Sequence, residues 1–277
     1  MIIEFTKMEG LGNDYVYIYG DSQTIPNLKQ TIINISNRHF GIGSDGVIFI
    51  EESKKADFRM RMFNADGSEG NMCGNGIRCV GKYIYDKGLS NNKLLNIETL
   101  SGIKQLELDV RNNKVEAIKV NIGKPSLKIK DLPIKFEKEE MISYPYKIDG
   151  KEYLFTAVSF GNPHLICFCE DVASLDLEKL GPLFQSIDFL KEEVNIEFVE
   201  IVDRTHLKMR VYERGSNETL ACGTGACAVC VAGYLNGYSE KKVIVHLLGG
   251  DLEIEWSDQN VFMKGPAKIV FEGKIEI

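Results

Sequence analysis

The chain has 277 residues and a formal net charge of −7, which excludes a strongly basic nucleic-acid surface. Its length suits one large domain or two of ordinary size, and its composition is that of an ordinary globular protein. No apolar run approaches the roughly 18 residues of a membrane span, and the opening residues lack the basic and apolar regions of an export signal. Seven cysteines, an odd number, favour free thiols in a reducing cytoplasm over a disulfide framework. We therefore expect a cytoplasmic protein with no nucleic-acid or membrane partner.

Alternating apolar residues predict strands in both halves of the chain. In chain order these are Gly46–Glu51, Leu94–Thr99, Gln105–Val110, Val115–Ile122, Leu165–Cys169, Ile196–Val202, Lys208–Tyr212, Leu252–Trp256 and Val261–Lys264. Turn-forming residues separate several of them, as at Arg111-Asn112-Asn113. The segment Lys124–Tyr146 is predicted to connect the halves and to add an edge element, and Ala267–Ile277 alternates like a strand that returns to the first half.

Three segments have helical patterns: Thr31–Phe40, Cys73–Lys87 and Cys222–Asn236. Gly88 and Gly237 follow the last two, where glycine commonly ends a helix. Both of these helices are apolar on most sides, which indicates that they are buried. The pattern predicts an α+β protein in which each half is a curved, largely antiparallel sheet or barrel wrapped around a central helix.

The second half of the chain repeats the first. Met60–Val80 reads MRMFNADGSEGNMCGNGIRCV and Met209–Val229 reads MRVYERGSNETLACGTGACAV, a gapless shift of 222 − 73 = 149 residues. Such a chain consists of two copies of one unit, which usually pack about a pseudo-twofold axis. We expect a first domain at residues 1–123, with the strand at 267–277 as a candidate to complete it, and a second domain at 124–266.

Each copy carries a Cys-Gly-x-Gly turn where a helix begins. A helix start offers unpaired N–H groups and a partial positive charge of roughly +0.5, which can hold a carboxylate. The same field favours a thiolate, so the pKa values of Cys73 and Cys222 are expected to fall from about 8.5 towards neutrality. A pseudo-twofold axis would bring both turns to one cleft. A thiol on each side of one substrate carbon is what inversion of that carbon needs.

A buried core cysteine is the simpler interpretation of a single turn of this kind, but two copies at one constant shift favour function. The remaining cysteines are expected in the core: Cys79, Cys167, Cys169, Cys227 and Cys230. Cys227-x-x-Cys230 lacks the second pair that a zinc site needs, and Gly41–Gly46 lacks the Lys-Ser/Thr of a phosphate-binding loop. We expect no metal site, and His39, His206 and His246 have no motif around them.

These motifs resemble those of the diaminopimelate epimerase family. The resemblance rests on Phe63–Glu69 followed by Cys73–Cys79, on Glu213–Gly215 followed by Ala221–Cys227, and on Lys7–Asp14, Gly41–Gly46 and Gly161–His164. It covers essentially the whole chain. It implies a cofactor-independent isomerase that converts LL-diaminopimelate to the meso form, in lysine and peptidoglycan precursor biosynthesis.

The resemblance also implies roles for individual residues. Cys73 and Cys222 would exchange the α-proton on opposite faces, while His164 and Glu213 would tune or relay protons beside Asn13. The α-carboxylate would lie on N–H groups of Gly74, Asn75, Gly223 and Thr224. The distal amino-acid end would be held by Asn64, Asn162, Asn195 and Arg214, because a guanidinium bonds two carboxylate oxygens at once. Some relatives have Gln where this chain has Gly46, so any contact by that side chain is absent here.

Three alternatives stay open at this point. A proline or hydroxyproline racemase uses the same two-thiol chemistry but has no need of a distal site such as Arg214. A thiol redox or metal-binding protein would depend on an oxidant or a metal, and a non-catalytic binding relative would need neither cysteine. The sequence also leaves open whether the chain forms a homodimer and which thiol is ionised at rest.

Overall fold

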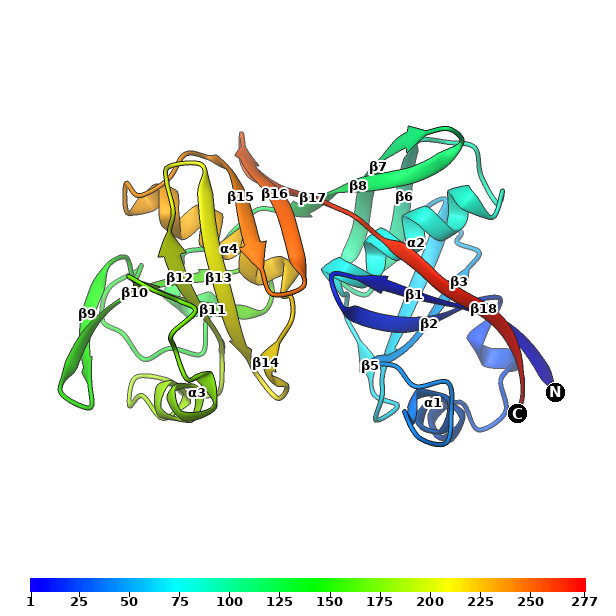
Figure 1. Cartoon of the computed structure of the whole chain (residues 1–277), viewed down its shortest axis with the longest axis horizontal. Helices are drawn as coiled ribbons and strands as arrows, with labels where there is room; N and C mark the ends of the chain where they lie inside the picture. Colours follow the sequence, from blue (N-terminus) through cyan, green and yellow to red (C-terminus); the bar gives the residue numbers. More distant parts are fainter. The chain divides into compact units, whose positions relative to one another are not determined.

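The computed structural model describes all of residues 1–277, which divide into two compact units (Figure 1). Unit 1 comprises Met1–Asn121 and Lys264–Ile277, and unit 2 comprises Ile122–Met263. Each unit mixes sheet and helix, so the predicted α+β class is confirmed. None of the helices is both long and apolar enough to cross a membrane.

Unit 1 is a twisted sheet with the helix α2 packed against its inner side (Figure 1). Its elements are β1 (Ile2–Gly10), β2 (Asn13–Tyr19), η1 (Ser22–Thr24), α1 (Leu28–Ser36), β3 (Gly46–Glu51), β4 (Phe58–Asn64), β5 (Glu69–Gly70), α2 (Gly74–Asp86), β6 (Leu94–Thr99), β7 (Gly102–Arg111), β8 (Lys114–Gly123) and β18 (Lys268–Glu276). Most strand pairs are antiparallel, and β2–β3 and β4–β6 are parallel. The residues Ile77, Val80 and Ile84 of α2 are fully buried, as the apolar pattern predicted.

The last strand closes the outer edge of β1. It runs antiparallel to β1 from Ile2 opposite Glu276 to Glu9 opposite Lys268. The two ends of the chain therefore lie side by side, and the amino group of Met1 donates to the carbonyl oxygen of Ile277 at 2.9 Å.

Unit 2 has the same architecture around α4. Its elements are η2 (Ile129–Asp131), β9 (Tyr144–Ile148), β10 (Lys151–Ser159), β11 (Pro163–Cys169), α3 (Leu177–Gln185), β12 (Asn195–Ile201), β13 (His206–Glu213), β14 (Asn217–Thr219), α4 (Gly223–Leu235), β15 (Lys242–Leu247), β16 (Gly250–Ser257) and β17 (Asn260–Gly265). The parallel pairs are β11–β12 and β13–β15. The connecting segment contributes Ile129, Leu132, Ile134 and Met141 to the core of this unit, so it is more than an edge element.

The sequence repeat is also a repeat of secondary structure. The shift of 149 residues carries α1 onto α3 (28 + 149 = 177) and α2 onto α4 (74 + 149 = 223). It also carries β1 onto β10 (2 + 149 = 151). β1 is flanked on its outer side by β18 and β10 by β9, each antiparallel.

The predicted strands are all present with ends moved by a few residues, but the predicted helix Thr31–Phe40 has the wrong bounds. The helix runs from Leu28 to Ser36. It ends at Asn37, whose backbone is extended and whose side chain accepts the N–H groups of His39 and Phe40 at 2.9 Å each. An asparagine that bonds its own following backbone competes with helix continuation.

Candidate functional site

Cys73 caps the start of α2 in unit 1. Its backbone is extended, with φ −123° and ψ 121°, and its Sγ accepts the N–H of Gly76 at 3.3 Å. The thiol donates to Oδ1 of Asn13 at 3.2 Å, while Nδ2 of Asn13 donates to Asp45 at 2.7 Å. Asp45 therefore orients the amide of Asn13 with its oxygen towards the thiol.

The other predicted residues of unit 1 lie at or near this turn. Gly74 and Asn75 are the buried first residues of α2, and the side chain of Asn75 accepts from Arg78 at 3.0 Å. Asn64 is exposed at the end of β4 and donates to Ser68 at 3.0 Å. Tyr15 was not predicted, yet burial first, then the charges of Cys73 and Asp45, raise its pKa, which places its phenol close to the thiol.

Gly46 has a structural explanation in this chain. A Cβ added at this position would come within 1.9 Å of the carbonyl oxygen of Phe63, the residue paired with Val47 on the neighbouring strand. The backbone around Gly46 therefore leaves no room for a side chain at this position.

Cys222 occupies the corresponding position at the start of α4 in unit 2, with φ −113° and ψ 109°. Its sulfur lies 3.7 Å from Oγ1 of Thr224, which accepts from Nδ2 of Asn162 at 3.1 Å. Burial first, and then the charges of Glu213 and Glu197, raise the pKa of the Cys222 thiol well above its ordinary value. The predicted fall in pKa is therefore wrong for Cys222, because burial and two carboxylates outweigh the field of the helix start.

Glu213 stands at the end of β13 beside the same turn. Its Oε1 accepts from Oγ1 of Thr219 at 2.5 Å. Burial is the largest cause that raises the pKa of Glu213, and the charge of Glu197 adds to it, while His164 lowers it. The thiol of Cys222 thus shares its surroundings with an acid that is held partly towards its neutral form.

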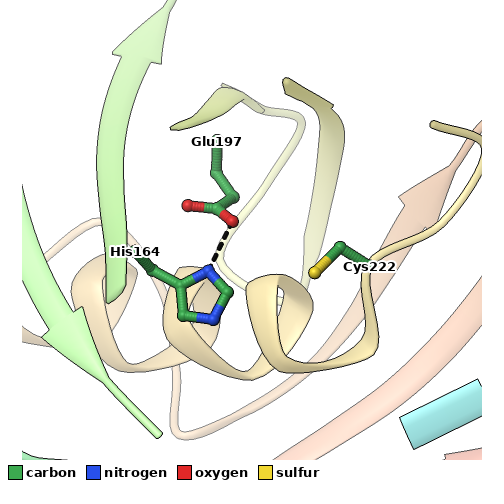
Figure 2. A group of neighbouring side chains, drawn as sticks. All are labelled: His164, Glu197 and Cys222. Carbon is green, nitrogen blue, oxygen red and sulfur yellow. Dashed lines mark hydrogen bonds and ion pairs between the residues drawn. The ribbon is translucent and has the colours of Figure 1, made fainter. Parts of the chain in front are cut away.

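His164 projects from β11 and Glu197 from β12, and Figure 2 shows both beside Cys222. Both side chains are fully buried, and Nδ1 of His164 lies 2.6 Å from Oε1 of Glu197. A ring nitrogen of His164, a carboxylate oxygen of Glu197 and the sulfur of Cys222 all lie within 4.8 Å of one another. The structure therefore brings His164 and Glu213 to the Cys222 turn.

Glu197 was missed as a site residue by the sequence analysis, which assigned it only to a strand. The available signal was an acidic residue inside the apolar run Val194–Val199, at a position where the first half has Ile48 (197 − 149 = 48). The types of ligand that His164, Glu197 and Cys222 offer also suit zinc. In the structure the imidazole and the carboxylate are hydrogen-bonded to each other.

Asn195 and Arg214 are joined through the backbone. Nδ2 of Asn195 donates to the carbonyl of Pro163 at 3.1 Å, and its Oδ1 accepts the N–H of Arg214 at 3.0 Å. The side chain of Arg214 is exposed, and no acidic side chain of the chain forms an ion pair with it. Its guanidinium is therefore available to an anion.

The predicted residues thus fall into two groups. Unit 1 holds Asn13, Asn64, Cys73, Gly74 and Asn75, and unit 2 holds Asn162, His164, Asn195, Glu213, Arg214, Cys222, Gly223 and Thr224. Within each unit the cysteine turn, its asparagine and the first glycine of the helix lie together. A shared site formed by both units stays a proposal.

The remaining cysteines form no disulfide bonds, and Cys79, Cys167, Cys227 and Cys230 are buried as predicted, with Cys169 half-buried against the core of unit 2. Burial raises the pKa values of Cys79, Cys167 and Cys230 to about 12 each. Thiols with such pKa values are unreactive at neutral pH.

Comparison with known proteins gives one family. The family model described as diaminopimelate epimerase matches residues 5–128 and 156–270. A diaminopimelate epimerase from Acetivibrio thermocellus is 53% identical over 277 residues, which is 99% of this chain and 99% of the relative. One from Methanococcus maripaludis is 53% identical over 99% of this chain and 100% of the relative.

Solved structures of more distant proteins share the fold. A phenazine biosynthesis protein of the PhzF family from Bacillus anthracis has a TM-score of 0.70 at 19% identity and covers 100% of both chains. A probable proline racemase from Agrobacterium radiobacter has a TM-score of 0.71 at 10% identity, over 99% of this chain and 92% of the other. Likeness at these identities shows the fold alone.

Proposed function

Because this chain belongs to the diaminopimelate epimerase family, amino-acid epimerases of lysine biosynthesis, we propose that Cys73 and Cys222 are the acid–base pair that inverts the substrate's α-carbon. The observation that carries the proposal is the structural repeat. Each of the two units places one cysteine as the cap of a buried 13-residue helix that begins with Gly. None of the other five cysteines lies at the start of a helix, which leaves these two as the candidates for chemistry.

In the proposed reaction the two turns act on one carbon. The thiolate of one cysteine takes the α-proton, so the C–H bond breaks, an S–H bond forms and the electron pair passes to the carbon and its carboxylate. The thiol of the other cysteine then gives its proton to the opposite face. The N–H groups of Gly74, Asn75, Gly223 and Thr224 stabilise the negative charge on the carboxylate, as helix starts do for anions. No cofactor takes part in these steps.

Burial and acidic neighbours oppose the ionisation of Cys222. Glu213 and Glu197 both oppose a negative charge on Cys222. We assign Cys222 as the partner that carries a proton in the resting enzyme. His164 and Glu213 adjust its proton during turnover, and Asn13 orients Cys73 in the other unit.

The second amino-acid head of diaminopimelate is assigned to Arg214, together with Asn64, Asn162 and Asn195. The exposed, unpaired guanidinium of Arg214 supports this, because a fork of N–H donors suits a carboxylate. Asn195 contributes by fixing the backbone of Arg214. Proline, the substrate of the alternative enzyme, has no second amino-acid end that could bind these residues.

The enzyme is further proposed to work in the cytoplasm and as a homodimer. Analytical ultracentrifugation tests the oligomeric state.

Exchange of the α-proton with deuterated water tests the proposal. Wild type should exchange and invert LL- and meso-diaminopimelate and leave L-proline unchanged. Cys73→Ser and Cys222→Ser should each lower turnover at least about 100-fold, because a hydroxyl is far too weak an acid to replace the thiol. Retention of more than about a tenth of wild-type turnover, equivalent to roughly 1.4 kcal/mol of barrier, in either variant would refute the two-thiol mechanism. Activity on L-proline alone would favour the racemase.

A further inference from the structure

Glu197 is a fully buried carboxylate with an incomplete set of hydrogen bonds. Its Oε1 lies 2.6 Å from Nδ1 of His164, and its Oε2 has no hydrogen-bond partner. Burial of a carboxylate is strongly unfavourable unless it is paired and hydrogen-bonded. A buried polar group that stays partly unsatisfied needs an explanation other than stability.

The first turn of the helix α4 leaves space for this carboxylate. A Cβ at Gly225 would come within 2.6 Å of Oε1 of Glu197, so the second glycine of the Cys-Gly-x-Gly turn makes the room. In unit 1 a Cβ at Gly76 would come within 2.7 Å of Cδ1 of Ile48, the residue equivalent to Glu197. An aliphatic side chain therefore fills the same space in unit 1, and packing alone does not require an acid in unit 2.

The carboxylate also decides which nitrogen of His164 carries a proton. A carboxylate oxygen at 2.6 Å from Nδ1 accepts a hydrogen bond, so Nδ1 is the protonated nitrogen of the neutral ring and Nε2 keeps its lone pair. Nε2 is buried and has no hydrogen-bond partner. The equivalent residue in unit 1 is Tyr15 (164 − 149 = 15), so only the Cys222 turn has an imidazole base.

We propose that Glu197 is a positioning residue for proton transfer at Cys222 and acts through His164, an inference that rests on the proposed function. With Nδ1–H held by Glu197, Nε2 accepts the proton of the Cys222 thiol. The S–H bond breaks, an N–H bond forms on Nε2, and the electron pair remains on sulfur. The carboxylate of Glu197 balances the imidazolium charge until the proton returns.

The groups that face this proton come from four elements: Cys222 from α4, His164 from β11, Glu197 from β12 and Glu213 from β13. Glu213 and Glu197 oppose the ionisation of Cys222, whereas an imidazolium beside the sulfur favours it. Glu197 therefore has two effects on the thiol. Its direct charge adds to burial and to Glu213 in keeping the resting thiol protonated, and its hold on His164 provides the route by which that proton leaves.

Three variants separate positioning from packing. Glu197→Gln keeps the shape and the hydrogen-bond acceptor but removes the charge, and kcat/KM should fall about tenfold, mostly in kcat. Glu197→Ile copies unit 1, and kcat/KM should fall about 100-fold while the fold is kept. Glu51→Gln is the matched control, since Glu51 is a buried carboxylate that accepts from Ser22 in unit 1. It should change thermal stability and leave kcat/KM within about twofold of wild type.

Two further readouts show whether Glu197 acts through His164. In the His164→Asn background, Glu197→Gln should have no added effect on kcat/KM, because residues that act as a unit are not additive. In ¹⁵N-histidine-labelled protein, the signal lost in His164→Asn should show a proton on Nδ1 in wild type, and Glu197→Ile should lose that pattern. All assays contain a chelator.

The proposal is overturned if Glu197→Ile keeps wild-type kcat/KM, if the Glu197→Gln loss persists in the His164→Asn background, or if wild-type His164 carries its proton on Nε2. Loss of wild-type activity in the chelator would also overturn it, because His164, Glu197 and Cys222 would then hold a cation. Failure of the proposed function looks different. In that case wild type fails to exchange the α-proton of diaminopimelate, or Cys222→Ser retains turnover.

Discussion

The turn at Cys73 in unit 1 and the turn at Cys222 in unit 2 share one scaffold but differ in the side chains at equivalent positions. In each unit an arginine forms a bidentate ion pair with a glutamate: Arg61 with Glu69 at 2.8 and 2.9 Å, and Arg210 with Glu218 at 2.7 and 2.9 Å. At equivalent positions unit 1 has Tyr15, Ile48 and Asn64, where unit 2 has His164, Glu197 and Glu213 around Cys222. The duplicated fold has therefore kept its scaffold and placed an imidazole and two glutamates beside one cysteine, which gives the two thiols unequal surroundings.

The largest expected difference between the turns follows from the second glycine of each. Gly225→Ala should lower kcat/KM about 100-fold, because the new methyl would displace the carboxylate of Glu197 and contact the sulfur of Cys222. Gly76→Ala meets the flexible ends of Ile48 and Met60 and Cβ of Cys73, so it should lower kcat/KM less than tenfold. Steady-state kinetics of both variants, with circular dichroism as a check on folding, make the comparison. Equal losses in both would mean that Glu197 adds nothing to the second turn.

Arg214 has no counterpart in unit 1, where the equivalent residue is Ala65 (214 − 149 = 65). Arg214→Lys keeps the charge and loses the planar fork, so KM for diaminopimelate should rise about tenfold. Arg214→Ala, which copies unit 1, should raise it further. A substrate analogue that lacks the distal carboxylate should be equally poor with wild type and with both variants. Unchanged KM values would move the distal group away from Arg214.

The unequal thiols should also differ in their response to pH. Burial first, and then Glu213, raises the pKa of Cys222, so this thiol keeps its proton at neutral pH and loses it only as the pH rises. Alkylation of Cys222 by iodoacetamide should accelerate towards alkaline pH. Glu213→Gln removes a negative charge, which lowers the pKa of Cys222 and should speed alkylation near pH 7.5 several-fold, because the thiolate fraction rises roughly tenfold when the pKa falls by one. Peptide mass mapping measures this.

The internal control for that experiment is the buried set Cys79, Cys167 and Cys230, whose pKa values are about 12. These three should stay unlabelled in the native chain at every pH tested. Slower alkylation of Cys222 in Glu213→Gln would contradict the assigned electrostatic effect.

The smallest expected difference concerns the two arginine–glutamate pairs of the shared scaffold. Arg210 bonds Glu218 and also donates to the carbonyls of Val172 and Leu175 at 3.1 and 2.7 Å, whereas Arg61 bonds Glu69 and donates to Oγ of Ser22 at 2.6 Å. Arg210→Ala should lower the free energy of unfolding by about 2–3 kcal/mol, since two buried carbonyls lose a charged donor, and Arg61→Ala by about 1–2 kcal/mol. Urea titration measures both. A larger loss for Arg61 would reverse the ranking.

The sequence predicted the two helices that carry the cysteines and most strands, but it did not predict α3. That helix contains Gly181 and Pro182, which disfavour helices locally. Gly181 is explained by packing, because a Cβ there would come within 2.3 Å of the ring of Tyr212. The repeat could have revealed α3 through its copy α1, since the shift relates them residue by residue.

The site was predictable as far as its chemistry depends on local sequence. The Cys-Gly-x-Gly turns stand at helix starts, as the sequence predicted, and the field of a helix start is a local rule that predicts a lowered thiol pKa. The pKa of Cys222 departs from that rule because of burial first, and then because of Glu213 and Glu197, which reach the turn from other strands. Glu197 was missed for the same reason: its partner His164 is brought to it only by the parallel pairing of β11 with β12.

The closure of β1 by β18 has a consequence for how the chain is made. Residues 122–263 form a contiguous unit, but unit 1 needs β18, which is synthesised after unit 2. After Asn121 has been made, 276 − 121 = 155 more residues are needed to complete β18, which is roughly 8–30 s of synthesis. During that time the outer edge of β1 is an unpaired strand, able to pair with a neighbouring nascent chain. Unit 2 should therefore fold first, and chains cut short before Lys268 should aggregate through their first strand.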